Sequence, residues 1–151
     1  MSEIERPQIQ NPRNRLRFGL SSMVIGLFIF ILGAKPQWFN LDASEAIGFI
    51  QMGVFSFGLV LICAGGTLSL DALWKSEARS IVADLGLRLA WTGLIVAILS
   101  ALADMIGVGT RPFPEFQIFF GYWQARGVIA GELIMIVGFL MMIPFKPKEK
   151  D

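Results

Sequence analysis

Glu132 is the residue whose type and position in this sequence most favour chemistry. It lies ten residues into an apolar stretch that runs from about Tyr122 to Phe145. If that stretch is a membrane-spanning helix, the carboxyl group lies roughly 15 Å from the outer end, near the middle of the bilayer. A carboxyl there is expected to be protonated or hydrogen-bonded, and could relay a proton or bind a partner subunit or a ligand. A neutral hydrogen bond between helices is the alternative.

Asp104 and Arg126 are the next polar candidates. Each lies about one helical turn inside the outer end of an apolar stretch, so their depths match and a salt bridge is expected. This pair is interpreted either as a structural clasp or as a functional site. If it is a clasp, Asp104→Ala should destabilise the protein, because it leaves the arginine charge without a partner.

The residues that most enzymes need are missing. The sequence contains no His and a single Cys, Cys63, so it offers no nucleophile–base pair, no disulfide within one chain and no cluster of metal ligands. We therefore expect neither an enzyme nor a bound metal or cofactor. The net charge of +1 gives no basic face for nucleic acid.

The elements that must position these residues are apolar helices. The chain is 54% hydrophobic, and the apolar residues come in four blocks that are long enough to cross a bilayer as helices. These predicted spans are residues 18–34, 46–70, 85–108 and 122–145. The sequence thus predicts an all-α integral membrane protein, a bundle of four transmembrane helices over residues 18–145. A cleaved signal peptide at the first span is disfavoured, since Pro36 follows a poor cleavage site.

Basic residues predict the orientation. Ten of the 13 lie in the two tails (1–17 and 146–151) or around the loop between spans two and three, whereas Lys35, Arg111 and Arg126 lie on the other side. The positive-inside rule then places both termini in the cytoplasm, with a prokaryotic cytoplasmic membrane as the expected location. The segment 71–84 has apolar residues at helical spacing and predicts a short amphipathic helix that lies on the cytoplasmic surface or continues into span three.

Aromatic residues concentrate in the two outer loops. They are interpreted as a belt at headgroup depth or as a docking surface for a lipid, a pigment or another subunit. The residues are Trp38, Phe39, Phe116, Phe120, Tyr122 and Trp123.

Small residues recur at intervals of three, four or seven in spans one, three and four. Such stripes let membrane helices approach closely, so they predict a compact bundle. The glycines are Gly19, Gly26 and Gly33 in span one, Gly86 and Gly93 in span three, and Gly127, Gly131 and Gly138 in span four. In span two, Gly48, Gly53 and Gly58 are five apart and are predicted to wind around the helix.

The two halves of the chain resemble each other. Residues 18–32 align with 85–99, and the pattern glycine, aromatic, apolar, glutamine occurs at 48–51 and at 121–124. A tandem duplication of a two-helix hairpin would explain this and would place Gln51 and Gln124 at equivalent depths. Similar packing requirements in unrelated helices are the alternative.

Two classes of function fit these features best. The first is a structural or accessory subunit of a larger membrane assembly, with the lipid bilayer and other membrane subunits or further copies of the chain as partners. The second is a small carrier or binding protein for a lipid, quinone, pigment or other apolar ligand, using Glu132 and the outer aromatic residues. A proton-coupled transporter is a weaker third hypothesis, because spans one and two offer few polar residues.

Overall fold

The computed structural model describes residues 12–39, 49–74, 79–103 and 121–144. Within these residues the chain forms four α-helices and a short 3₁₀ turn. The helices are α1 (Pro12–Ala34), α2 (Phe49–Leu73), α3 (Ile81–Leu102) and α4 (Tyr122–Met142), with the turn η1 at Pro36–Phe39. All four helices are long and apolar enough to cross a membrane.

The helix ends follow from local chemistry. Pro36 disfavours helical geometry at the preceding residue, and α1 accordingly ends at Ala34. Ser80 has extended backbone geometry and its hydroxyl accepts a hydrogen bond from the backbone N–H of Ala83, which caps the start of α3. Pro144 follows the extended residue Ile143, and α4 ends at Met142.

The predicted amphipathic helix over 71–84 does not form as one element. The first three of its residues complete α2, residues 79 and 80 are not helical, and the last four begin α3. The cap at Ser80 explains the break, because a residue with extended backbone geometry interrupts a helix. Residues 75–78 lie outside the described residues.

The observed bounds also differ from the predicted spans. Helix α1 begins at Pro12 rather than at residue 18, so Arg13, Arg15 and Arg17 of the predicted N-terminal tail lie on its first turns. Helix α2 ends at Leu73, three residues after the predicted end, and α3 begins at Ile81, four residues before the predicted start. The predicted span residues 46–48 and 104–108 lie outside the described residues.

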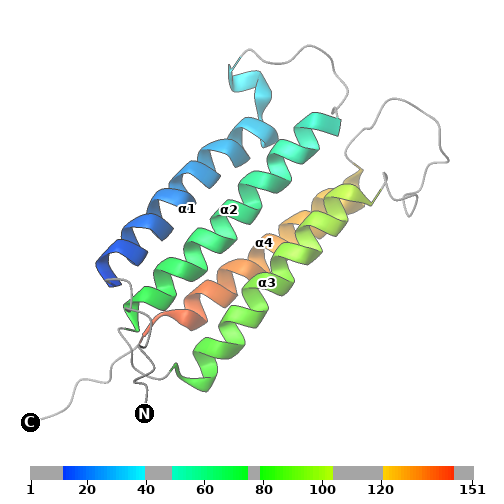
Figure 1. Cartoon of the computed structure of the whole chain (residues 1–151). Coiled ribbons are helices and arrows are strands. Elements are labelled where there is room, and N and C mark those ends of the chain that lie inside the picture. The colour runs from blue at the N-terminus through cyan, green and yellow to red at the C-terminus, as the bar shows by residue number, and fades with distance from the viewer. Residues whose placement is uncertain (1–11, 40–48, 75–78, 104–120, 145–151) are drawn as a thin grey trace, which may run out of the picture.

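The four helices run alternately up and down as two hairpins (Figure 1). Helix α1 packs along α2 and α3 packs along α4, while α2 also contacts both α3 and α4. Among the described residues α1 contacts neither α3 nor α4. Helix α2 is therefore the element that joins the hairpins.

Glycines form the interface within each hairpin. A methyl group at Gly26 would lie 2.9 Å from the carbonyl oxygen of Gly58, and one at Gly93 would lie 2.5 Å from that of Gly131. Seven residues along each helix, Gly19 faces Gly65 and Gly86 faces Gly138 in the same way. The backbones thus touch where a side chain would hold them apart.

The remaining stripe residues make similar contacts. Gly33 packs against the backbone of Phe55, and Gly127 packs against the side chain of Ser100. In α2 the glycines that face α1 are Gly58 and Gly65, seven apart, whereas Gly53 faces open space. The expectation that the glycines of this helix wind around it therefore missed a stripe that begins at Gly58.

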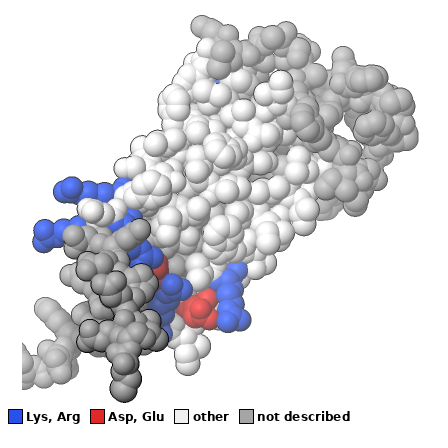
Figure 2. Space-filling view, viewed as in Figure 1, with Lys and Arg blue, Asp and Glu red and all other residues white. Residues whose placement is uncertain are grey.

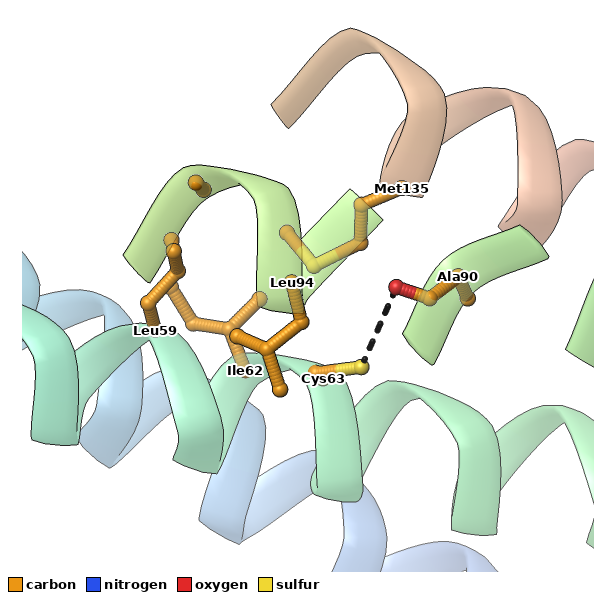
Figure 3. Close-up of a cluster of buried hydrophobic side chains, with 7 residues drawn as sticks. Leu59, Ile62, Cys63, Ala90, Leu94 and Met135 are labelled. Carbon is orange, nitrogen blue, oxygen red and sulfur yellow. Dashed lines mark hydrogen bonds between the residues drawn. The ribbon is translucent and has the colours of Figure 1, made fainter. Parts of the chain in front are cut away.

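Larger side chains fill the space between the hairpins. A buried cluster joins Leu59, Ile62 and Cys63 of α2 with Leu94 of α3 and Met135 of α4, together with small alanines (Figure 3). The Cys63 thiol lies 3.8 Å from the carbonyl oxygen of Ala90, its weak hydrogen-bond acceptor. A second cluster, nearer the start of α2, joins Met52, Phe55, Ala101 and Val128.

The outer surface of the bundle is apolar and its charge is concentrated at one end. On the face that Figure 2 shows, most of the visible Lys, Arg, Asp and Glu side chains gather where α1 begins, and the body beyond them is largely uncharged. Large apolar side chains such as Phe18, Val24, Leu133 and Leu140 are about half exposed or more. Apolar surface of this extent is typical of contact with a membrane or with another protein.

Candidate functional site: a cavity between the first hairpin and α4

A cavity of about 470 Å³ opens between the end of α1, the start of α2 and the first half of α4. This volume lies within the range of roughly 300–1,000 Å³ that is usual for small-molecule sites. Its lining is mostly apolar, and the polar members are Lys35, Gln51 and Glu132. The cavity exists because α1 and α4, which flank it, do not contact each other.

Helix α4 supplies one wall of the cavity. Ala125, Val128, Ile129 and Glu132 follow one another at steps of three, one and three residues, so they share one face of the helix. Val128 is buried and also packs in the cluster with Met52 and Phe55. Glu132 is therefore held on a wall whose position is set by a packed core.

The first hairpin supplies the opposite wall. Gly33, Ala34 and Lys35 come from the end of α1, and Met52 and Phe55 come from the first turns of α2. The Gln51 amide nitrogen donates a 3.0 Å hydrogen bond to the carbonyl oxygen of Gly33, which ties the two helices together at the mouth. Because the amide nitrogen makes this bond, the amide oxygen of Gln51 is the group that remains to accept a bond from a ligand.

Glu132 is half-buried in the wall and forms no ion pair with any residue that the structure describes. It lies at the middle of α4, about 15 Å along the helix from Tyr122. Lys35, another lining residue, is exposed and directly follows the last residue of α1. The cavity lining thus includes a basic group directly after α1 and an acidic group at the middle of α4.

The two glutamines that the sequence placed at equivalent depths have different roles. Both lie in the first turn of their helices, but Gln51 lines the cavity while Gln124 is buried elsewhere. The Gln124 amide oxygen accepts a 2.8 Å hydrogen bond from the backbone N–H of Gly121 and so caps α4. Its amide nitrogen has no partner among the described residues.

Arg126 lies over aromatic rings. Its guanidinium carbon is 4.2 Å from the centre of the Tyr122 ring and 5.5 Å from that of Trp123, which is cation–π geometry. Asp104, the predicted partner of Arg126, lies outside the described residues. The charge of Arg126 suggested an ion pair, and the cation–π contact with the rings of Tyr122 and Trp123, about one turn before it on the same helix, was not predicted.

The outer aromatic residues that the structure describes lie on the surface. Trp38, Tyr122 and Trp123 are largely exposed, and Phe39 meets Phe28 of α1 edge to face, with 5.7 Å between ring centres. Phe116 and Phe120 lie outside the described residues. None of these four described rings is among the residues that line the cavity.

An ion-pair cluster at the opposite end was missed from the sequence. The carboxylate of Asp71, near the end of α2, accepts a 2.8 Å hydrogen bond from Arg15 of α1 and also pairs with Arg79, just before α3. Arg88 pairs with Asp84 one turn away on α3, and both side chains are well exposed. The first cluster connects three segments, whereas the second is local to one helix.

The described residues around the cavity offer groups that can contact a ligand. They contain no cluster of three or more metal-ligating side chains. Cys63 is buried in the core, away from the residues that line the cavity. What the cavity can do is hold an apolar molecule and contact it through one acid, one amide oxygen and one base at the mouth.

Comparison with known proteins gives no relative: no family model, no curated protein and no solved structure matches this chain.

Proposed function

We propose that the chain is an integral membrane protein whose four helices all cross the bilayer. The support is the length and apolar composition of α1, α2, α3 and α4 and the exposed apolar side chains along them. The proposed orientation puts the charged end of Figure 2 in the cytoplasm, because Arg13, Arg15, Arg17, Arg79 and Arg88 gather there. A prokaryotic cytoplasmic membrane is the proposed location.

We also propose that the two hairpins arose by tandem duplication. The support is the matching contacts of Gly26 with Gly58 and of Gly93 with Gly131. A glutamine lies seven residues before the second glycine of each pair, and another glycine lies seven residues after it. The hairpins then share one orientation in the membrane and relate by an axis along its normal.

For this bundle we propose the function of a small carrier or binding protein for an apolar or amphiphilic molecule. The observation that carries the proposal is the cavity of about 470 Å³ with Glu132 in its wall. Further support comes from the mostly apolar lining, against which the apolar part of a membrane-dissolved molecule can pack.

Filling the cavity tests this function. Ala125 lines the cavity, and Ala130 is exposed on the same helix outside the lining, so Ala125→Trp and Ala130→Trp are a matched pair. The protein is exposed to a total lipid extract of the expression host in mild detergent. Native mass spectrometry then identifies the small molecules that each variant retains, and circular dichroism checks that the helices are intact.

The wild type and Ala130→Trp should retain the same bound molecule, and Ala125→Trp should lose most of it. A smaller change, Ala125→Leu, should reduce retention partly, and it keeps the test valid if the tryptophan variant does not fold. Equal retention in all variants, or none in the wild type, contradicts the proposed function.

A structural or accessory subunit is the second proposed function. Its specific support is the group of exposed aromatic side chains at the outer end, Trp38, Tyr122 and Trp123, which suits contact with another membrane protein. Gentle extraction followed by native mass measurement tests it. A stable complex with a foreign subunit supports this function, and a chain that runs alone or only with copies of itself contradicts it.

A further inference from the structure

Glu132 lacks a partner for its charge within the described part of the chain. Its neighbours in the cavity wall are apolar, and the bundle around it is apolar as well. An ionised carboxylate in such surroundings is costly unless a proton or a cation neutralises it. The site therefore requires a positive charge to accompany the carboxylate whenever it is ionised.

The acid is not required for packing the helices. Glu132 directly follows Gly131, which faces Gly93, and Leu59 directly follows Gly58, which faces Gly26. Leu59 is thus the counterpart of Glu132 in the first hairpin, and it is almost completely buried in the core. An apolar side chain satisfies the hairpin geometry at this position, so the carboxyl of Glu132 has another use.

The other charged groups near the cavity do not neutralise Glu132. Lys35, directly after α1, lines the cavity but is exposed, and it forms no ion pair with Glu132. Arg126 of α4 is exposed and lies over the Tyr122 and Trp123 rings. From α2 the polar lining residue is Gln51, which does not titrate, and none of the lining residues comes from α3.

We propose that the cavity binds a lipophilic organic cation, an amine or quaternary onium group on an apolar body, in exchange for a proton on Glu132. On binding, the O–H bond of the carboxyl breaks, the proton passes to water, and the ligand's positive charge pairs with the carboxylate. The charge inside the cavity stays neutral throughout. This inference rests on the proposed ligand-binding function and names the class of ligand.

The geometry suits this class. The lining gives an apolar body a wall to lie against, formed by Met52, Phe55, Val128 and Ile129. A carboxylate in an apolar cavity repels an anion and leaves a neutral molecule without an ionic contact.

Two probes of nearly the same shape and opposite charge test the sign of the ligand. Tetraphenylphosphonium is the cation, tetraphenylborate is the anion, and tetraphenylsilane is the neutral control. Equilibrium binding is measured on the full chain in phosphatidylcholine nanodiscs, with empty nanodiscs to correct for partition into lipid. We expect saturable binding of the phosphonium and none of the borate.

The variants test the residue. Glu132→Gln should weaken phosphonium binding by about tenfold or more, since an ionic contact is lost. Asp84→Asn, which removes an exposed acid at the other end of the bundle, should leave binding unchanged. Glu132→Asp should keep part of the affinity and the pH dependence, which a purely structural role would not preserve.

The pH dependence tests the exchange. Protons compete with the cation for the carboxylate, so affinity should rise with pH by up to about tenfold per unit and then level off. In weak buffer, each bound phosphonium should release up to one proton, and Glu132→Gln should abolish both effects.

Several outcomes overturn the inference while leaving the ligand-binding function intact. The first is that the silane or the borate binds better than the phosphonium, and that Ala125→Trp abolishes this binding. The second is that Glu132→Gln leaves phosphonium binding unchanged. If no probe binds and the lipid extract leaves no retained molecule, both proposals fail.

Discussion

The indole nitrogen of Trp74 donates a 3.0 Å hydrogen bond to the backbone carbonyl oxygen of Met142. This bond joins the residue after α2 to the last residue of α4, so it links the two hairpins at the charged end of the bundle. Helix α4 stops at Met142, so the carbonyl oxygen of this residue has no N–H donor within the helix. The indole N–H of Trp74 supplies that donor.

Trp74→Phe should remove this hydrogen bond and keep most of the apolar contact. The expected loss in the free energy of unfolding is about 1 kcal/mol, as for other partly buried hydrogen bonds. Unfolding by a denaturing detergent, followed by circular dichroism, measures it. Trp91→Phe changes an exposed tryptophan of α3 and is the control. A loss no larger than that of the control contradicts the role of the bond.

Asp71→Asn should destabilise the protein more than Asp84→Asn. Asp71 holds Arg15 and Arg79 together across three segments, whereas Asp84 pairs with Arg88 on one helix. We expect about 1 kcal/mol for Asp71 and about 0.3–0.5 kcal/mol for Asp84, because the arginines are partly exposed and solvent screens them.

Salt should reduce the difference between these two variants. The Debye length falls from about 10 Å at 0.1 M to about 3 Å at 1 M ionic strength, so unfolding measured at both concentrations shows how much of the effect is ionic. A difference that is independent of salt would mean that Asp71 acts through its hydrogen bonds alone.

Gly93→Ala should separate α3 from α4. The added methyl group would lie 2.5 Å from the carbonyl oxygen of Gly131, so the backbones must move apart, at an expected cost of about 1–3 kcal/mol in stability. Gly53→Ala is the control, because that position faces open space and alanine favours the helix. If both variants unfold at the same detergent concentration, the glycine stripe does not limit the approach of the helices.

Cys63 should resist labelling in the folded protein. It is completely buried in the core between the hairpins, and it is the single cysteine of the chain. A maleimide reagent should therefore modify it at least about tenfold more slowly in mild detergent than after denaturation in sodium dodecyl sulfate. Serine 21 is exposed on α1, so Ser21→Cys in a Cys63→Ala background gives the accessible reference rate. Equal rates for the two cysteines contradict the packing of the hairpins.

The sequence predicted the four apolar helices because long blocks of apolar residues leave little choice of structure. Their bounds were harder to predict. Arg13, Arg15 and Arg17 are compatible with either a tail or a helix, and nothing in hydropathy reveals that α1 begins at Pro12. The break before α3 depends on a single serine cap at Ser80, which the apolar periodicity of 71–84 obscured.

The candidate site was predictable in part. Glu132 stood out because a carboxyl within a long apolar stretch is unusual, but Lys35 and Phe55 were not expected to join it. Lys35, Phe55 and Glu132 line one cavity because α1 lies apart from α4. The spacing of residues along one helix carries no information about how far apart two helices lie. The stripe of Gly58 and Gly65 was overlooked because it shares its helix with other glycines that break the pattern.

Ligand contact inside the cavity is the most direct test of the central claim, that the space between the first hairpin and α4 is a binding site. In a Cys63→Ala background, a trifluoromethyl label is attached to Ile129→Cys, which lines the cavity, or to Ala130→Cys, which does not. Fluorine NMR of each labelled protein in nanodiscs is then followed during a titration with tetraphenylphosphonium. The account predicts a saturable shift of the resonance at position 129 and an unchanged resonance at 130. Equal shifts at both positions, or none at 129 while the probe binds, would contradict it.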